Sequence, residues 1–331
     1  MLISPERIRV FRRSLVRWYA KHGRDLPWRQ TADPYAILVS DIMLQQTQVA
    51  AVVPFYERWL KRFPDFGALA TARQSDVLHA WQGLGYYNRA RNLQAAAKTV
   101  VRQHNGALPR DPAEIRLLPG LGRYTSNAVA TFAFNQSVPI VEANITRVIA
   151  RLFNIRLAVD STAGRERLWQ ATQSLVPKQN AGRFNSALMD LGALICVKTP
   201  RCHACPVRNL CRARRPRQLP IKKARRQTIH LAESHGFVRR HDQILLEKST
   251  GRWRGMWILP RVSNVPTGKQ PIHSSIFPFT HHRINLQVFR NNLLPSGSDR
   301  RWIPLDSLER IPIPSPHRRA LTSLLTEEDG A

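Results

Sequence analysis

Four cysteines lie within one short segment of the chain and could together hold a metal ion or a metal cluster. The segment runs from residue 196 to residue 211, with the spacing C-x5-C-x2-C-x5-C, and holds every cysteine of the sequence: Cys196, Cys202, Cys205 and Cys211. Thiolates this close together are typical ligands of zinc or of an iron–sulfur cluster, and the spacing alone leaves both open. Their confinement to one loop favours a metal or cluster site over a disulfide framework.

A second candidate site is a glycine-containing turn between two helical patterns. Gly120 and Gly122 lie in the segment Leu118–Thr125. Glycines two residues apart let the backbone turn tightly, and the N-terminus of the following helix presents N–H groups to an anion. The segment therefore predicts a phosphate-binding turn, with an ordinary corner between two helices as the alternative.

The charge of the chain indicates the kind of partner. Lys and Arg number 51 against 22 Asp and Glu, which gives 331 residues a formal charge of +29. Nucleic acid is favoured over a membrane surface, because the basic residues are spread along the chain and there is no long apolar run. A generically basic protein is the alternative. Residues Met1–Arg13 have no apolar run typical of a signal peptide, so we expect a cytoplasmic protein in a reducing compartment.

The elements that must position these residues are helices in the first two thirds of the chain. Helix starts are indicated at Ser4–Pro5 and Asp111–Pro112, where a capping side chain precedes proline. Further helices are expected over Ile37–Phe55, Val77–Leu84 and Asn88–His104, which are separated by Gly or Pro turns. We therefore expect an all-α region up to about residue 215.

The last third has a different pattern. Pro216–Gln227 is basic and interrupted by proline, and it predicts a linker able to lie along a DNA backbone. Beyond it, Gln243–Glu247, Trp257–Pro260 and Ile284–Val288 read as strands, and a closing helix begins at Ser315. The C-terminal third is thus expected to be a smaller α+β domain.

The segment before the cysteines resembles a known superfamily. Phe184–Ala193, running into Cys196, looks like the endonuclease III and MutY superfamily, where the four cysteines hold a 4Fe-4S cluster. The first gap is usually six residues in that superfamily and five here, and the deletion falls in a loop, so we expect ligation to survive. The resemblance implies a structural role that positions basic residues such as Arg201 and Arg208 at phosphates.

Other segments resemble MutY-type adenine DNA glycosylases more specifically. Leu26–Arg29, Met43–Val49 and Gly83–Tyr87 are near-matches to the signatures of that family. The resemblance implies that Gly120 and Gly122 form the helix-hairpin-helix of enzymes that bend DNA and flip a base into a pocket. It also assigns expected contacts: Gln46 wedging into the DNA stack, Tyr86 supporting it, and Leu26, Trp28, Arg29, Ser186 and Met189 around the base. For Tyr86, a core aromatic is the alternative.

The two carboxylates that the resemblance places at the catalytic centre are exchanged in this chain. The family has Glu as general acid and Asp as stabiliser of the oxocarbenium ion, whereas this chain has Asp41 and Glu142. Paired carboxylates suit this reaction, because the base needs a proton and the sugar needs a negative charge. Since the total number of methylenes is unchanged, we expect a pocket displaced toward Asp41.

Three further residues complete the expected centre. Tyr124 lies where bifunctional relatives have a Schiff-base lysine, which implies a monofunctional enzyme with the phenol hydrogen-bonded to Glu142. Asn144 is expected to be a second orienting partner. Ser186 replaces a Gln or Glu that reaches the adenine edge in the family, so the choice of base could be relaxed or changed.

The C-terminal third resembles the MutT-like (Nudix-like) domain of the family. The similarity covers Leu245–Lys248 and Gly251–Pro260, and the hydrolytic Nudix signature is absent, so we expect recognition without hydrolysis. Thr280 and His281 resemble the loop that examines 8-oxoguanine, with a polar turn before the strand as the alternative. The stretch between Pro260 and Phe279 is shorter than in the family.

The sequence predicts four parts. Residues 1–27 and 137–215 form an iron–sulfur cluster domain, 28–136 a six-helix barrel with the helix-hairpin-helix, 216–228 a basic linker, and 229–331 a MutT-like lesion-recognition domain. The predicted function is that of a monofunctional DNA glycosylase of base excision repair, a monomer acting on double-stranded DNA in which adenine is mispaired with 8-oxoguanine or G. An altered base specificity and a non-catalytic lesion-binding module are the alternatives.

Overall fold

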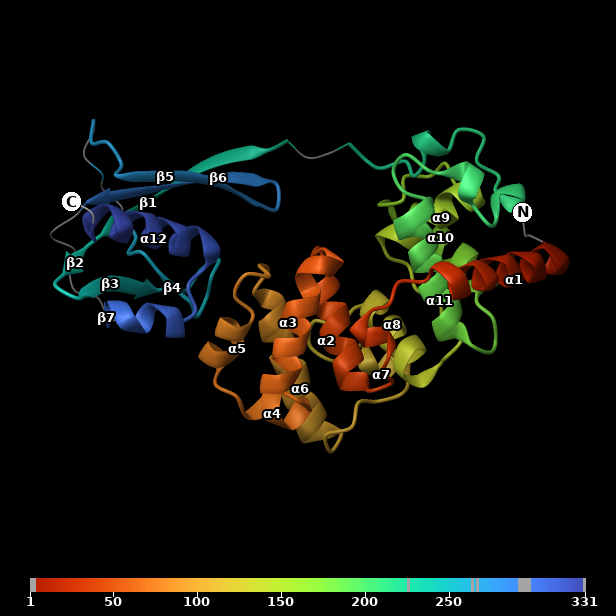
Figure 1. The fold of residues 1–331 in the computed structure, drawn as a ribbon, viewed down its shortest axis with the longest axis horizontal. Helices are drawn as coiled ribbons and strands as arrows, with labels where there is room; N and C mark the ends of the chain where they lie inside the picture. Colours follow the sequence, from red (N-terminus) through yellow and green to blue (C-terminus); the bar gives the residue numbers. More distant parts are fainter. Residues whose placement is uncertain (1–3, 225–226, 263–264, 266–267, 291–298, 330–331) are drawn as a thin grey trace. The chain divides into compact units, whose positions relative to one another are not determined.

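The computed structural model describes residues 4–224, 227–262, 265, 268–290 and 299–329 of a chain that divides into two compact units (Figure 1). The first unit comprises Met1–Leu60 and Ala96–Ala224, and the second comprises Lys61–Ala95 and Arg225–Ala331. Helices α3 (Val49–Arg62) and α6 (Asn88–Gln103) each contribute residues to both units.

The described part of the first unit is helical and contains no strand, as the sequence predicts for residues up to about 215. Besides its parts of α3 and α6 it contains α1 (Pro5–His22), η1 (Pro27–Arg29), α2 (Pro34–Leu44), α7 (Pro112–Ile115), α8 (Arg123–Phe134), α9 (Ala143–Leu152), α10 (Thr162–Leu175), α11 (Ala181–Asp190), η2 (Leu191–Ile195), η3 (Cys202–Ala204), η4 (Arg208–Leu210) and η5 (Pro216–Gln218).

Side-chain caps explain where several of these helices begin. Ser4 and Asp111 each precede a proline that begins a helix. The Ser4 hydroxyl accepts a hydrogen bond from the backbone N–H of Arg7, and the Asp111 carboxylate accepts one from that of Ala113. Both predicted helix starts are confirmed. Asp33 caps α2 in the same way, through the backbone N–H groups of the first turn.

Helix α2 is the central helix of the first unit. Every residue from Tyr35 to Met43 is buried, because the sequence of α2 is apolar on all faces apart from Ser40 and Asp41. Helix α2 packs against α8, so a polar side chain on either helix must find its partner in the contact between them.

Two predicted helices differ in their bounds. A single helix over Ile37–Phe55 is wrong: α2 ends at Leu44 and α3 begins at Val49, because Gln46 adopts a left-handed φ of 58° that ends the helix. The helix expected over Val77–Leu84 is α5 (Gln74–Ala80), and the residues after it form turns. The helix expected over Asn88–His104 is confirmed as α6.

The second unit combines short helices with two sheets (Figure 1). One sheet has the order β1-β6-β5, with β1 parallel to β6 and β5 antiparallel to it. In the other, β3 pairs with β2, β4 and β7, all antiparallel. The elements are α4 (Phe66–Thr71), α5, β1 (Ile229–Phe237), β2 (Arg239–Arg240), β3 (Gln243–Lys248), β4 (Trp257–Ile258), β5 (His273–Phe279), β6 (His282–Arg290), β7 (Arg300–Pro304), η6 (Leu305–Arg310) and α12 (Ser315–Asp329).

The predicted strands and the closing helix of the last third are confirmed. Strand β3 covers Gln243–Glu247, β6 contains Ile284–Val288 with its apolar side chains on the buried face, and α12 begins at Ser315. The strand predicted over Trp257–Pro260 is shorter in the structure, where β4 ends at Ile258. Helix α12 packs against β5, which gives the last third an α+β arrangement.

The stretch expected to be a linker packs in part against the first unit. Leu219 is buried, and its carbonyl accepts a hydrogen bond from the Arg151 guanidinium. The Ile221 carbonyl accepts one from the backbone of Val159. Together with the hydrogen bond from the Lys223 backbone to Asp160, these contacts attach part of residues 216–224 to the first unit despite their basic composition.

Candidate active site

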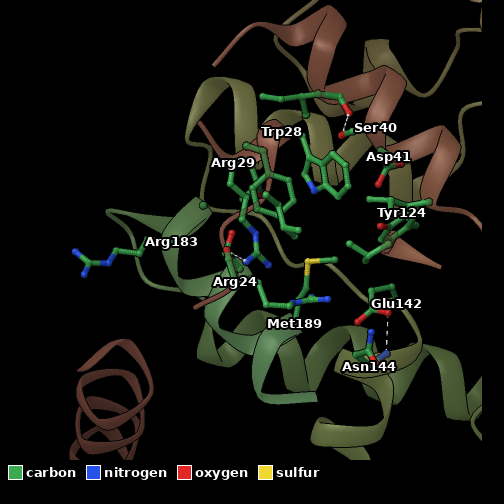
Figure 2. Close-up of a pocket in the computed structure, with 18 of the residues that line it drawn as sticks. Arg24, Trp28, Arg29, Ser40, Asp41, Tyr124, Glu142, Asn144, Arg183 and Met189 are labelled. Atoms are coloured by element: carbon green, nitrogen blue, oxygen red, sulfur yellow. Dashed lines mark hydrogen bonds between the residues drawn. The ribbon is translucent and has the colours of Figure 1, made fainter. Parts of the chain in front are cut away.

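A cavity of about 910 Å³ opens in the first unit between α2, α8, α9 and α11 (Figure 2). Both expected catalytic carboxylates, Asp41 and Glu142, line it, as do Tyr124 and Asn144. All five residues expected around the base line it too: Leu26, Trp28, Arg29, Ser186 and Met189. Residues far apart in the sequence therefore meet at one site, and Gln46 lies on its wall as well.

Asp41 is a buried carboxyl group on α2, with 7% of its surface exposed. Burial raises its pKa to about 6, an effect that hydrogen bonds from Tyr124 and Thr125 reduce and the charge of Glu142 increases. Its Oδ2 atom has no hydrogen-bond partner among the residues described. Asp41 is thus a buried carboxyl group that is partly protonated near neutral pH.

Glu142 reaches the cavity from the N-terminus of α9, which it caps. Its Oε2 accepts the backbone N–H of Asn144 at 2.7 Å and its Oε1 accepts that of Ile145 at 2.7 Å. Burial raises the pKa of Glu142, while these two N–H groups and the charges of Arg147 and Arg24 act in the opposite direction. Both oxygens therefore point back to the helix, and the extra methylene of Glu is used within the cap instead of extending toward Asp41.

Tyr124 interacts with Asp41, and the predicted hydrogen bond to Glu142 stays a prediction. Glu142 acts on Tyr124 as a nearby charge. The reason is the packing of α8 on α2, which places the first turn of α8 beside Asp41. Burial and Asp41 raise the pKa of Tyr124 well above its ordinary value, so the phenol stays protonated and acts as a donor.

Thr125 is a part of this site that sequence reasoning missed. It is 2% exposed, its hydroxyl acts on Asp41, and its Oγ1 accepts a hydrogen bond from the Gln45 amide at 3.2 Å. The available signal was its place directly after Tyr124 at the start of a helix that follows the glycine turn.

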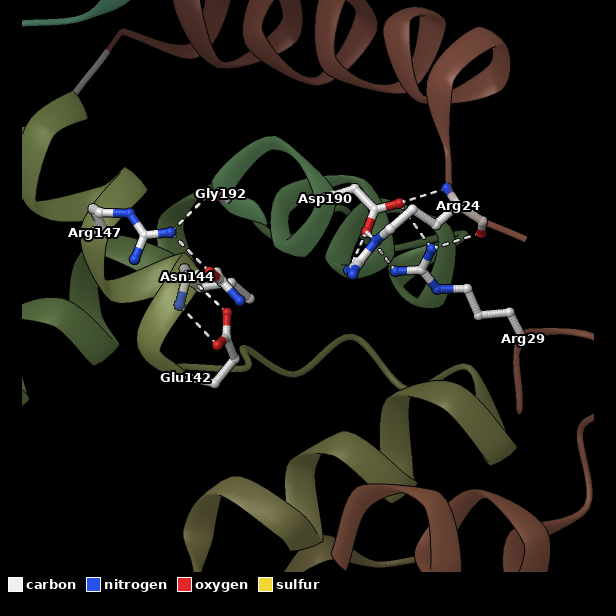
Figure 3. A network of polar contacts seen from close by, with 8 residues as sticks. Arg24, Arg29, Glu142, Asn144, Arg147, Asp190 and Gly192 are labelled. Carbon is white, nitrogen blue, oxygen red and sulfur yellow. Dashed lines mark hydrogen bonds and ion pairs between the residues drawn. The ribbon is translucent and has the colours of Figure 1, made fainter. Parts of the chain in front are cut away.

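Arg147 connects the cap of α9 to the cysteine loop (Figure 3). Its guanidinium donates to Asn144 Oδ1 at 2.7 Å and to the carbonyls of Gly192 and Cys196 at 2.6 Å each. At Gly192 a Cβ atom would lie 2.7 Å from the Cβ of Asn144, so only glycine allows this approach. The side chain of Asn144, which is expected to orient the catalytic centre, is thus held by Arg147, an arginine that the sequence did not single out.

Arg29 is held at the wall of the cavity by an ion pair that the sequence did not reveal (Figure 3). Its two terminal nitrogens lie 2.8 and 2.9 Å from the carboxylate oxygens of Asp190, which also accepts the backbone N–H of Arg24 at 2.9 Å. Burial alone would raise the pKa of Asp190, but its hydrogen bonds with Arg29 and Arg24 hold it below its ordinary value. The signal in the sequence was that Asp190 lies among apolar residues at the end of α11, where a buried acid needs a basic partner.

Aromatic and apolar side chains form one part of the cavity wall, beside polar ones. Trp28 packs edge-on against Tyr56, with 5.5 Å between ring centroids, and Figure 2 shows Trp28 and Met189 on the side of the cavity opposite Asp41 and Tyr124. Ser186 is buried at this wall. A flat aromatic group with polar edges could lie between these walls and the carboxylates.

The glycine turn has the geometry expected of an anion site. Gly120 has a φ of 76°, which favours glycine, and Gly122 precedes the first turn of α8 without a side-chain cap. A Cβ at Gly122 would meet no atom within 4 Å, so a ligand can approach the backbone there. Neither glycine lines the cavity.

The other residues expected at DNA lie in the second unit. Tyr86 is 45% exposed with a φ of 48°, which is unlike the core aromatic of the alternative interpretation. Thr280, with a φ of 53°, and His281 form the turn between β5 and β6. The Thr280 hydroxyl lies 3.4 Å from Nδ1 of His281 and 3.3 Å from Nδ1 of His282.

The four cysteines are free thiols that lie near one another. Burial is the largest cause that raises the pKa of Cys205 to about 11, and the charges of the other three thiols contribute in the same direction. Within the described ranges, no group of three or more His, Cys, Asp or Glu is arranged to hold a single metal ion. The donor set is four thiols, of which Cys202 begins the 3-10 turn η3 and Cys205 and Cys211 each follow a 3-10 turn.

Arg151 supports the cysteine loop through hydrogen bonds, a role that sequence reasoning missed. Only 2% of its surface is exposed. Its guanidinium donates to the carbonyls of Cys196, Val197, Lys198 and Leu219 at 2.6 to 3.1 Å, and to Cys196 Sγ at 3.3 Å. These contacts hold the first part of the loop in place.

Among the described residues, none of the helices has the length and apolarity needed to cross a membrane.

Comparisons with known proteins place this site in a class. Residues 39–174 match the HhH-GPD superfamily of base excision DNA repair proteins. Among solved structures, a thermostable thymine-DNA glycosylase is 32% identical with a TM-score of 0.58 and covers 62% of this chain and 96% of its own. A non-covalent endonuclease III–DNA complex has a TM-score of 0.55 at 23% identity, covers 64% of this chain and 96% of its own, and shows the likeness of the fold.

Curated relatives narrow the class. The adenine DNA glycosylase of Buchnera aphidicola subsp. Baizongia pistaciae is 31% identical over 341 residues, which cover 95% of this chain and 97% of the relative. The human adenine DNA glycosylase is 43% identical over 217 residues, 62% of this chain but only 40% of that longer protein. The chain belongs to the adenine DNA glycosylase family, whose members are hydrolases acting on N-glycosyl bonds.

Proposed function

We propose that this protein removes adenine from DNA by hydrolysing its N-glycosyl bond. The observation that carries the proposal is the buried carboxyl group of Asp41, which has a pKa of about 6 and an oxygen without a partner among the described residues, beside a cavity that Glu142 also lines. The relatives that cover most of this chain are named adenine DNA glycosylases, which supports adenine over another base and over a non-catalytic module.

In this proposal the two carboxylates have different roles. Protonated Asp41 donates to a ring nitrogen of the flipped base and makes it a better leaving group. Glu142, which its capping N–H groups and the charge of Arg147 favour in the ionised form, stabilises the positive charge that develops on the sugar. Water then adds to the sugar carbon, and the proton that it loses balances the proton taken up by the base.

The exchange of Asp and Glu moves the pocket toward α2. The side chain of Asp41 is one methylene shorter than Glu, or about 1.5 Å, and Glu142 does not lengthen toward it because both of its oxygens cap α9. The base must therefore lie deeper, between the apolar walls and α2. Ser186, which is shorter than the Gln or Glu of the family, leaves space beside the base for this position.

Tyr124 supports a hydrolysis without strand cleavage. A phenol has no amine with which to form a Schiff base with the sugar. Burial and Asp41 also raise the pKa of Tyr124 well above its ordinary value, so its hydroxyl stays protonated. In the proposed reaction it donates to Asp41, which lowers the pKa of that carboxyl group and keeps it oriented in the cavity.

Double-stranded DNA is the proposed partner, as the formal charge of +29 and the glycine turn suggest. The N–H groups at Gly120 and Gly122 bind phosphates, Gln46 enters the stack beside the cavity, and Tyr86 supports the distorted duplex. The second unit contributes a MutT-like reader, in which Thr280 and His281 contact 8-oxoguanine opposite the target.

The four cysteines are proposed to hold a 4Fe-4S cluster. Their free thiols, which lie close enough to raise one another's pKa, and the arginine-supported loop are consistent with a shared metal site, and membership of the family favours the cluster over zinc. The cluster would supply a rigid link in the loop and takes no part in the hydrolysis. The gap between Cys196 and Cys202, one residue shorter than usual, leaves both residues in the loop.

The test is base release from defined duplexes. Adenine is placed opposite 8-oxoguanine, G or T, and abasic sites are revealed by alkali. The expected result is release of adenine opposite 8-oxoguanine and G, without strand cleavage before alkali. The Asp41→Asn variant should release no adenine. Release of another base would contradict the assignment to adenine, and tight binding without any release would contradict the enzyme. The double variant Asp41→Glu, Glu142→Asp tests whether the exchange limits the rate.

A further inference from the structure

The loop that presents Tyr86 has an unusual backbone. Within four residues, Gly83, Gly85 and Tyr86 have φ values of 106°, 68° and 48°. Glycine adopts this region readily, but a tyrosine does not, and such a conformation persists only where surrounding contacts hold it. Tyr86 is nevertheless 45% exposed, so its own ring contributes little to holding the loop.

The contacts that hold the loop come from Arg89. One terminal nitrogen of its guanidinium donates to the carbonyl of Leu84 at 3.0 Å and to that of Gly85 at 3.3 Å. Its backbone N–H donates to the carbonyl of Tyr86 at 2.8 Å. Arg89 thus binds three successive carbonyls, those of the residues that form the left-handed turn.

The same guanidinium also contacts two aromatic rings. It lies 5.6 Å from the ring centroid of Tyr86 and 5.4 Å from that of Trp81, whose indole N–H donates to the carbonyl of Gly85 at 3.1 Å. Trp81 is fully buried, so it provides a fixed base for the arginine. Burial lowers the pKa of Arg89 to about 10, which leaves it charged at neutral pH and able to attract both ring faces.

We propose that Arg89 is the positioning residue for Tyr86, holding its ring in the orientation that supports DNA during extrusion of the base. The inference rests on the proposed DNA contact of Tyr86. Arg89 acts through backbone carbonyls and ring stacking and needs no contact with DNA of its own. Its loss should therefore impair extrusion of the base and leave the hydrolytic step unchanged.

Arg91 provides a matched control on the same helix. Its guanidinium also binds a backbone carbonyl, that of Arg254 at 2.8 Å, and also bonds Asn88. The variants Arg89→Met and Arg91→Met remove the same charge and one guanidinium each, so an effect of charge on phosphate binding is common to both. An effect through Tyr86 is specific to Arg89.

The experiment measures extrusion and excision separately. A 2-aminopurine next to the target adenine reports extrusion in stopped-flow fluorescence, and single-turnover excision reports the chemistry. Arg89→Met and Tyr86→Ala should each slow extrusion about tenfold, the double variant no more than either, and Arg91→Met less than about twofold. In a duplex whose target adenine faces an abasic site, where extrusion is easy, Arg89→Met should excise at the parent rate.

Three results would overturn the inference. They are normal extrusion by Arg89→Met, losses that multiply in the double variant, or a loss of excision that the abasic partner does not restore, which would indicate a general structural defect. Arg89→Lys, which keeps the charge but not the planar stacking group, should lie between the parent and Arg89→Met. If the parent protein releases no adenine from any duplex, the proposed function fails instead.

Discussion

Replacing Asp41 by Asn should make the protein more stable and inactive, and the gain in stability should depend on pH. Burial raises the pKa of Asp41 from 3.8 to about 6. Between these values the folded protein binds a proton that the unfolded chain has released, so the free energy of unfolding falls as the pH rises. Above pH 6 the folded protein contains a buried charge, which Asn removes while keeping the size and the acceptor oxygen.

The size of the effect follows from the two pKa values. One pKa unit corresponds to about 1.4 kcal/mol, so the full difference is about 3 kcal/mol at pH 8. The same relation gives about 1.5 kcal/mol at pH 5 and about 0.5 kcal/mol at pH 4. Because Asp41 is only 7% exposed, screening by solvent reduces these values little.

The assay is chemical denaturation followed by tryptophan fluorescence at several pH values. The difference in the free energy of unfolding between variant and parent should grow from pH 4 to pH 7 and then level off. Asp25→Asn, which removes an exposed carboxylate, is the control and should show no such dependence. A difference between Asp41→Asn and the parent that is equal at all pH values, or a destabilised variant at pH 8, would refute the reasoning.

Three other predictions concern the surroundings of Asp41 and the cysteine loop. Tyr124→Phe removes a hydrogen bond that lowers the pKa of Asp41, so the pH above which single-turnover excision declines should move upward; a downward shift would contradict the assigned hydrogen bond. Asp190→Asn leaves Arg29 without its carboxylate and should cost about 2 to 3 kcal/mol of unfolding free energy, whereas Arg73→Ala, which removes an exposed ion pair, should cost under about 1 kcal/mol. Stripping bound iron with a chelator should leave the helical content in far-UV circular dichroism unchanged, because the buried arginine fixes the loop; loss of helix would contradict this.

The elements could be predicted largely from local sequence, and the site only in part. Helix starts at Ser4 and Asp111 and the strand at Ile284–Val288 follow from caps and periodicity that involve neighbours in the chain. The break at Gln46 could not, since it depends on one left-handed residue between two apolar patterns. The predicted strand at Trp257 was too long for a related reason, because pairing with β3 sets where β4 ends.

Within the site, residue types were easier to predict than partners. The cavity contains every residue expected at the catalytic centre and around the base. The surroundings of Tyr124 were harder to predict, because the packing of α8 on α2 determines which carboxylate the phenol lies beside. Asp190 and Arg151 were missed for a similar reason: each is a buried charge whose role is visible only from contacts with residues distant in the chain.

The buried guanidinium of Arg151 limits where the cysteine loop can accept a change in length. This guanidinium binds the carbonyls of Cys196, Val197 and Lys198, so the backbone of these residues is held in place. The first cysteine gap is one residue shorter than usual in the family, and this difference must therefore lie in the exposed part of the loop that follows. A change in the length of this gap is therefore expected to alter the backbone after Lys198 and to leave the contacts between Arg151 and Cys196 unchanged.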